Sequence, residues 1–270
     1  MKLAIFCNNS RGLELIKYLE KKYRIELVII AKKNLDKSIL KYIKDKFFFK
    51  IVRDVNSSNI FNLIKKKNID INIIAGFPYI LKKKIIDSSK FGTINLHGGK
   101  LPDYRGGSPL NWQIIKNEKK IGLSIIKISE QIDKGPLVAK TSFILKKTDN
   151  INDIKLKSFK FFKKIIIKSI NKFIKKKFLK IDYKKGCYYK QRNKNDSRIY
   201  FNKMTNLQVY NMVRASNHPY DAFYFINNKK VLLKKVIISK IKLTGEIGSI
   251  SKINNFIFIK CKRGTIKVLK

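Results

Sequence analysis

Cysteine is scarce in this chain, and the cysteines that occur are widely spaced. They are Cys7, Cys187 and Cys261 in a chain of 270 residues, and no two of them show the CxxC spacing. An odd and dispersed set argues against a disulfide framework and against a zinc site. We therefore expect three structural thiols, a reduced cytoplasmic setting and no bound metal.

Long apolar runs are also missing. No stretch approaches the ~20 consecutive apolar residues that a transmembrane helix needs. Residues 2–7 form a short, largely apolar run that Asn8 interrupts at once, which is unlike a signal peptide. We expect a soluble protein that has no membrane partner.

Acidic residues are few relative to basic ones. Asp and Glu number 18 against 62 Lys and Arg, which gives a formal net charge of +44. One interpretation is a polyanionic partner such as nucleic acid. The other is compositional drift, because Ile, Lys, Asn and Phe are abundant while Ala, Gly and Pro are scarce. The lysines are spread along the chain and greatly outnumber the arginines, whereas a dedicated nucleic-acid surface more often concentrates arginine. We favour drift, although the charge still attracts anionic substrates.

The first hundred residues alternate between buried strands and amphipathic helices. Expected strands cover residues 1–7, 25–31, 49–52, 69–75 and 93–97, and further strands follow at 122–128 and 137–143. Strand–helix alternation predicts an α/β fold with a Rossmann-like, open, mostly parallel sheet. The first turn lacks GxGxxG, so dinucleotide binding is not supported there. Ligands of such sheets bind beyond the carboxyl ends of the strands.

The composition changes near Lys184. A long basic helix is expected at 154–179, with its apolar stripe packed on the sheet, and residues 188–195 have the composition of a linker. After the linker we expect a helix at 206–215 and short strands at 230–239, 245–250, 256–260 and 265–269. These predict a small β-barrel-like (OB-like) domain. We therefore expect a catalytic domain over 1–185 and a small C-terminal β domain over 196–270.

Candidate catalytic residues gather at the end of the strand at 93–97. Asn95 and His97 lie two residues apart, so their side chains share one side of the strand. A loop rich in glycine follows, which lets backbone approach a ligand closely. Asp133 lies in a second loop; if that loop folds back, its carboxylate orients the His97 ring and raises its pKa. The alternative is that Asn95 caps the strand and His97 is a satisfied loop residue. The only other histidine, His218, is expected to be a structural turn residue.

The stretch NLHGGKLPDYRGGSPLNW, residues 95–112, with Asp133 and Gly135 after it, resembles the signature of the folate-dependent formyltransferase family. The resemblance implies that Asn95 holds the formyl oxygen as it becomes an oxyanion and that His97 stabilises it and shares in proton transfer. It implies that Asp133 supports His97 and helps to take the proton of the attacking amine. The co-substrate is then 10-formyltetrahydrofolate, and no metal is required. Pro136 stands where family members often carry a second acid.

The resemblance also implies binding residues. Those for the folate are Phe77, Tyr79, Ile80, Leu81, Leu101, Pro102 and Asp133. The alternative for residues 76–81 is an ordinary strand-to-helix turn, and we favour the pocket because ligands bind beyond the strand ends. The residues for the acceptor substrate are Asn8, Lys100, Tyr104, Arg105 and Gly106.

The C-terminal part resembles the same family, so the resemblance covers nearly the whole chain. Residues 196–199, 210–215 and 219–223 are similar to the family's D-G-R-I, Y-N-x-x-R-A and P-Y-x-G-A-F elements. The H-G-G-K-L-P loop, the short chain and the short first turn favour a nucleotide-linked amino sugar as the acceptor. The charge of +44 suits the alternative, methionyl initiator tRNA. A second alternative is a non-enzymatic, basic nucleic-acid-binding protein, against which the trio Asn95, His97 and Asp133 counts. The small domain is compatible with a homodimer.

Overall fold

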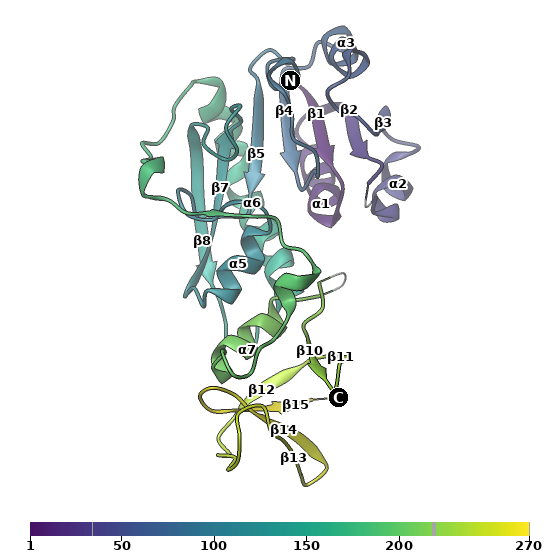
Figure 1. Cartoon of the computed structure of the whole chain (residues 1–270). Helices are drawn as coiled ribbons and strands as arrows, with labels where there is room; N and C mark the ends of the chain where they lie inside the picture. Colours follow the sequence, from purple (N-terminus) through teal and green to yellow (C-terminus); the bar gives the residue numbers. More distant parts are fainter. Residues whose placement is uncertain (34, 218–219, 270) are drawn as a thin grey trace. The chain divides into compact units, whose positions relative to one another are not determined.

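A computed structural model describes residues 1–33, 35–217 and 220–269 (Figure 1). They divide into two compact units. The first holds Met1–Gly106, Gly122–Phe143 and Lys155–Tyr188, and the second holds Gly107–Ile121, Ile144–Ile154 and Tyr189–Lys270. The domain boundary expected between residues 185 and 196 stays a prediction. His218, expected to be a turn residue, lies outside the described residues.

The first part of the chain alternates strands and helices, as its hydrophobic pattern predicts. Up to Tyr189 the elements are β1 (Lys2–Cys7), α1 (Ser10–Leu19), β2 (Arg24–Ala31), α2 (Lys37–Ile43), β3 (Phe49–Val52), α3 (Ser58–Lys66), β4 (Ile71–Ala75), α4 (Lys83–Ile86), β5 (Thr93–His97), β6 (Arg105–Gly106), α5 (Pro109–Ile115), β7 (Lys120–Lys127), β8 (Leu137–Ile144), α6 (Ile151–Ile174) and β9 (Tyr188–Tyr189).

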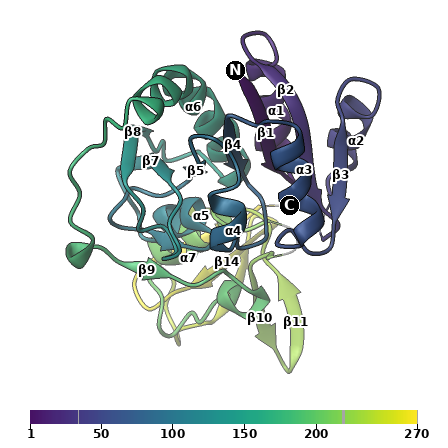
Figure 2. The same cartoon turned by 90° about the horizontal axis from the view of Figure 1, so that it is seen from above.

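A seven-stranded sheet forms the centre of the first unit, in the order β3-β2-β1-β4-β5-β7-β8. The strands from β3 to β5 pair in parallel, and β7 runs antiparallel to β5. Seen from above in Figure 2, the strands follow one another across the unit from β8 to β3. The predicted Rossmann-like, mostly parallel sheet is confirmed, and β4 and β5 end side by side at its carboxyl edge.

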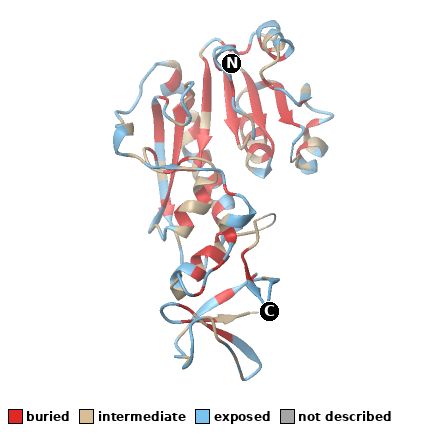
Figure 3. Cartoon of the chain, in the orientation of Figure 1, coloured by how far each residue is buried: buried red, intermediate tan, exposed pale blue. Residues whose placement is uncertain are grey.

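Helices bury both faces of this sheet. On one face, Phe6 and Ile29 belong to an apolar cluster with Ile64 of α3 and Ile85 of α4. On the other face α1 approaches β1 closely, since a Cβ atom at Gly12 would lie 2.1 Å from Cβ of Cys7. Figure 3 shows that the inner strands of this sheet are mostly buried, whereas the edge strands β3 and β8 are partly exposed. Each CH₂ group that is buried stabilises a fold by about 0.8 kcal/mol. This continuous apolar sheet is therefore the main source of stability.

The second unit combines helices with short antiparallel strands. After Tyr189 its elements are α7 (Asn206–Arg214), β10 (Phe223–Ile226), β11 (Lys229–Leu232), β12 (Val236–Ser239), β13 (Ile250–Ile253), β14 (Phe256–Lys260) and β15 (Thr265–Val268). One sheet has the order β12-β15-β14-β13, and β10 and β11 form a hairpin. Val209 and Met212 of α7 pack with Val236, Ile259 and Ile266 of the sheet. The predicted C-terminal domain of small antiparallel strands is confirmed.

The segment 188–195, which has the composition of a linker, holds a fully buried arginine. The guanidinium of Arg192 donates to the carbonyl of Ala215 at 3.1 Å and to Oγ of Ser197 at 2.7 Å. It also donates to Oγ of Ser216 at 3.2 Å. A buried guanidinium needs such acceptors, because an unsatisfied charge inside a protein is costly. Composition alone does not show that this segment is ordered.

Some predicted boundaries are wrong. The strand expected at 245–250 is a turn, because Gly245 and Gly248 have φ angles of 83° and 92°, which a strand does not accommodate. The strand expected at 230–239 divides into β11 and β12. The helix expected at 154–179 is α6, which ends at Ile174, and Lys176 follows with a φ of 52°. Within the described ranges, no helix combines the length and the apolar character that crossing a membrane requires.

Candidate functional site

Asn95 and His97 lie at the carboxyl end of β5, where the sequence places them. Strand β5 pairs with β4 on one side and with β7 on the other, and His97 faces Ser124 of β7 in the register. His97 is buried, with 5% of its surface exposed, while Asn95 is half-buried. The amide of Asn95 makes no hydrogen bond to another described residue. It is therefore free to donate to a substrate that enters beside His97.

Asp133 reaches His97 from the loop between β7 and β8. Its Oδ2 lies 3.4 Å from Nδ1 of His97, and the Asp133 side chain is 12% exposed. The same oxygen accepts the backbone N–H of Gly106 at 2.9 Å. The loop thus folds back toward the end of β5, as its proposed pairing with His97 requires.

The His97 ring meets an acceptor on each side. Its Nε2 lies 2.8 Å from the carbonyl oxygen of Tyr104. Because a carbonyl can only accept, Nε2 carries the ring proton, and Nδ1 is the nitrogen that faces Asp133. A second proton on Nδ1 would make the ring cationic, and the Asp133 carboxylate would then stabilise it.

The pKa of His97 is lowered from its ordinary value, whereas the sequence led us to expect a rise. Burial is the main cause, since it disfavours the charged ring. Asp133 and the Tyr104 carbonyl act in the opposite direction, and the charge of Arg11 lowers the pKa further. The Asp133 carboxylate acts in the direction expected from the sequence, but the desolvation of the ring outweighs it. His97 is consequently neutral near pH 7.

The loops that touch His97 carry local backbone strain. Tyr104 has a φ of 59° and Asp133 a φ of 50°, both in the left-handed region that residues other than glycine rarely adopt. A Cβ atom at Gly99 would lie 2.3 Å from Nε2 of His97, so this position admits only glycine without displacement of the ring. Such outliers persist where surrounding contacts impose them, and they cluster at functional sites.

The residues expected to bind the folate fall into two groups. Phe77 packs edge-on against Phe6 and against Tyr79, with ring centroids 5.6 Å apart in each pair. Leu81 is buried in the core next to α3 and α4, while Ile80 is 69% exposed. This segment follows β4, so it lies at the same edge of the sheet as His97.

Leu101 and Pro102 belong to the loop after β5. Leu101 is buried with Ile126 and Leu137, and its N–H donates to Oγ of Ser124 at 3.3 Å. Pro102 follows a cis peptide bond and packs close to Gly186, where a Cβ atom would lie 2.1 Å from the Pro102 carbonyl oxygen. Both residues brace the loop.

The residues expected to bind the acceptor are mostly buried. The side chain of Asn8 donates to the carbonyl of Lys33 at 2.5 Å, and the carbonyl of Tyr104 faces His97. The guanidinium of Arg105 donates to the carbonyl of Gly186 at 2.9 Å. Gly106 binds Asp133 through its N–H, as described above, and Lys100 is exposed. Among these five residues only Lys100 is exposed.

Two residues near the trio escaped the sequence analysis. Tyr183 donates its hydroxyl to the carbonyl of Gly135 at 2.6 Å, two residues after Asp133. Burial, then the Asp133 charge, raises the pKa of Tyr183 to about 12. Arg11 of α1 lies close enough to His97 to lower its pKa. Neither Tyr183 nor Arg11 belongs to the sequence motif at 95–135, and only the folding of the chain brings them close to it.

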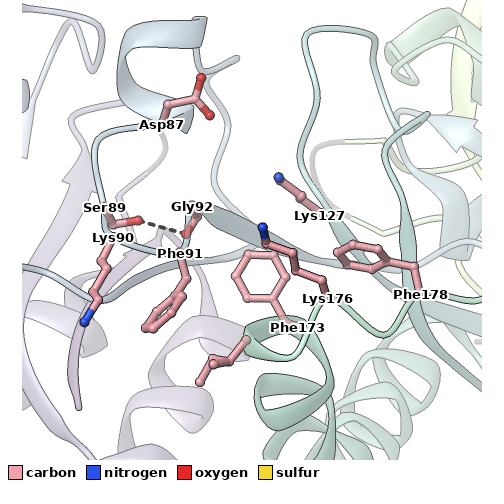
Figure 4. Close-up of a pocket in the computed structure, with 10 residues that line it drawn as sticks. Asp87, Ser89, Lys90, Phe91, Gly92, Lys127, Phe173, Lys176 and Phe178 are labelled. Atoms are coloured by element: carbon pink, nitrogen blue, oxygen red, sulfur yellow. Dashed lines mark hydrogen bonds between the residues drawn. The ribbon is translucent and has the colours of Figure 1, made fainter.

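The pocket drawn in Figure 4 is a separate feature. It has a volume of about 270 Å³ and is lined by Lys90, Phe91, Lys127, Phe173 and Lys176, among others. It lies at the amino end of β5, opposite His97, whereas ligands of such sheets bind at the carboxyl ends. In the part of the chain that the structure describes, no three His, Cys, Asp or Glu side chains gather as metal ligands would.

The mostly parallel sheet thus carries Asn95, His97 and Asp133 at its carboxyl edge, and comparison with known proteins shows the family. The family model described as formyl transferase matches residues 8–170, and the one described as formyl transferase, C-terminal domain, matches residues 192–270. The chain therefore belongs to the formyl transferase family, which confirms the resemblance seen in the sequence.

Individual relatives are distant. The chain is 28% identical over 222 residues to the bifunctional polymyxin resistance protein ArnA of Wigglesworthia glossinidia brevipalpis, covering 80% of this chain and 33% of that protein. It is 26% identical over 195 residues to the methionyl-tRNA formyltransferase of Malacoplasma penetrans, covering 72% and 61%. The chain thus matches less than two thirds of the length of these relatives.

One solved structure shares the fold over the full chain. It is the N-formyltransferase of Helicobacter canadensis in complex with folinic acid and dTDP-3-aminofucose. The TM-score is 0.74 at 18% sequence identity, and the match covers 100% of this chain and 99% of that one. At this identity the likeness supports the fold alone.

Proposed function

We propose that this protein transfers the formyl group of 10-formyltetrahydrofolate to a primary amine, and that the amine belongs to a nucleotide-linked amino sugar. The observation that carries the proposal is the grouping of Asn95, His97 and Asp133 at the carboxyl edge of the sheet. Membership of the formyl transferase family supports the reaction type. The folate is a co-substrate, and the segment 77–81 beside His97 is where we propose that it binds.

In the proposed reaction the neutral amine attacks the formyl carbon. A bond forms between the amine nitrogen and that carbon, and the bond from the carbon to N10 of the folate breaks. The formyl oxygen carries negative charge in between, and the Asn95 amide is placed to donate to it. The proton that the amine loses ends on N10 of tetrahydrofolate, so atoms and charge balance.

His97 and Asp133 can hold that proton on its way. The lowered pKa keeps Nδ1 of His97 unprotonated at neutral pH and ready to accept. The Asp133 carboxylate, 3.4 Å away, stabilises the cationic ring that results. Burial of the ring excludes water and strengthens this interaction. A neutral histidine beside a carboxylate therefore suits the removal of a proton from an amine.

The proposal that the acceptor is a sugar rests on the loop after His97. Gly99 lets the loop backbone pack directly against the His97 ring, and the exposed Lys100 follows it with a positive charge. Such a loop suits a small anionic acceptor, and the H-G-G-K-L-P form is similar to that of the sugar-modifying branch. A second candidate is methionyl initiator tRNA, which the charge of +44 and the name of the Malacoplasma relative favour.

Parallel assays distinguish the candidates. Purified protein is incubated with 10-formyltetrahydrofolate and either a panel of nucleotide-linked amino sugars or methionyl initiator tRNA. Release of tetrahydrofolate and the mass gain of one formyl group are followed. We expect formylation of a sugar and not of the tRNA. Formylation of the tRNA alone would reverse the proposed acceptor, and a failure to bind folate would refute the reaction type.

A further inference from the structure

Arg11 is a cation next to the trio that pairs with no acidic side chain of the described residues. It is the second residue of α1, and its Nη1 lies 3.5 Å from the carbonyl oxygen of Leu96, the residue before His97. Its Nε is buried and has no hydrogen-bond partner among the described residues. A guanidinium offers five N–H donors, and leaving them unpaired inside a protein is costly. The geometry therefore leaves the Arg11 fork available to an acceptor that the protein itself does not supply.

A second cation lies at the same level on the neighbouring helix. Nζ of Lys163 on α6 lies 5.5 Å from the ring centroid of Tyr18 on α1, so the two helices approach each other at this point. Arg11 precedes Tyr18 by about two turns, and Lys155 precedes Lys163 by about two turns. Arg11 and Lys155 thus both lie near the beginnings of their helices, and the charge of Arg11 acts on Lys155.

The electrostatics agree with this placement. Burial, then the charge of Arg11, lowers the pKa of Lys155, and burial lowers the pKa of Arg11 to about 10. Arg11 therefore remains charged at pH 7. Neither Arg11 nor Lys155 forms an ion pair with a described acidic side chain. Lys155 is exposed and Arg11 is half-buried, so an anion from solution reaches Lys155 first.

We propose that Arg11 and Lys155 form a subsite that binds a phosphate group of the acceptor substrate. The inference rests on the proposed function, since it takes the acceptor to be linked to a nucleotide. A planar guanidinium beside an ammonium suits a diphosphate, because the fork binds two oxygens and the ammonium adds a point charge. In a nucleotide-linked sugar the diphosphate lies within one sugar ring of the amine. Arg11 lies correspondingly close to His97.

The subsite is tested with inorganic pyrophosphate and with dTDP and UDP, without any formyl transfer. Isothermal titration calorimetry compares wild type with Arg11→Met and Lys155→Ala. Arg24→Ala is the matched control, because Arg24 is exposed at the amino end of β2. We expect binding to weaken by about 10- to 100-fold in the two subsite variants and to stay unchanged in the control. Arg11→Met should melt no lower than wild type, because it removes an unpaired charge.

Three outcomes would overturn the subsite. One is unchanged binding of all three probes in Arg11→Met. Another is weaker binding of 10-formyltetrahydrofolate with pyrophosphate binding intact, which would assign Arg11 to a folate carboxylate. The third is weaker binding of initiator tRNA in Arg11→Met with no dTDP, UDP or pyrophosphate binding in wild type. Failure of the proposed function is distinct, since it shows as nucleotide binding without formyl transfer to any sugar.

Discussion

The carboxylate of Asp133 lies 3.4 Å from Nδ1 of His97, and the same oxygen accepts the N–H of Gly106. One side chain thus links the loop after β7 to the loop after β5. The acid is held by a backbone hydrogen bond, so it keeps its position while the ring gains or loses a proton. Four consequences of this arrangement can be measured.

Replacement of Asn95 by alanine removes the proposed donor to the formyl oxygen. We expect kcat to fall about 10²- to 10³-fold, the cost of losing one such donor, with little change in folate binding. Asn59→Ala is the matched control, because Asn59 is exposed on α3. Steady-state kinetics and a thermal melt separate catalysis from folding. An unchanged kcat in a folded Asn95→Ala protein would remove Asn95 from the mechanism.

The charge of Asp133 is tested by Asp133→Asn. The asparagine oxygen can still accept the N–H of Gly106, so the loop should stay in place while the charge facing His97 is lost. We expect kcat to fall about 10²-fold or more, since proton transfer loses its support. The acid limb of the pH profile should move to lower pH, because Asp133 raises the His97 pKa. Asp45→Asn, at an exposed position, serves as control. An acid limb that does not move would contradict the pairing.

The pH dependence of stability follows from the buried, neutral His97. Its folded pKa lies below the unfolded value of about 6.5, so the unfolded chain binds a proton that the folded chain does not. The free energy of unfolding should therefore fall as the pH drops below about 6.5. His97→Gln should show a weaker dependence in that window. Urea unfolding at pH 5 and pH 7 measures the difference, and equal dependence in both proteins would show that His97 is not buried in its neutral form.

Tyr183 is predicted to position the Asp133 loop. Tyr183→Phe removes the hydrogen bond to the carbonyl of Gly135 and should cost about 1 kcal/mol of stability. The kcat should fall several-fold while KM for folate changes little, because the loop is less well fixed. Tyr188→Phe, at a 57% exposed position, is the control. A stability loss with full kcat would make Tyr183 a structural residue only.

The sequence predicts the fold well where side chains are buried on a regular period. The strands β3, β5 and β14 begin and end at the residues expected, because apolar runs bounded by polar residues define them. The prediction fails at 245–250, where Ile247 and Ile250 suggest a strand and two glycines in the left-handed region make a turn. Helix α5 at Pro109–Ile115 was not predicted either, because the glycines and the proline at its start are typical of a loop.

The candidate site also divides into residues whose positions the sequence predicts and residues whose positions it does not. The placement of Asn95 and His97 on one side of β5 follows from the two-residue period of a strand. The proximity of Asp133 to His97 requires in addition that the loop between β7 and β8 folds back. The direction of the His97 pKa depends on how deeply the ring is buried, which a sequence does not state. Arg11 and Tyr183 come from elements far away in the chain, and their approach to the trio is a property of the packed sheet.

The central claim is tested most directly with 10-formyltetrahydrofolate that carries ¹³C in the formyl group. The labelled co-substrate is mixed with wild-type protein and nucleotide-linked amino sugars, and products are weighed by mass spectrometry, with Asn95→Ala in parallel. The account predicts that one labelled formyl group appears on a sugar amine with wild type and is largely lost with Asn95→Ala. Label that stays on bound folate or appears only as free formate, for every acceptor including the tRNA, would contradict it.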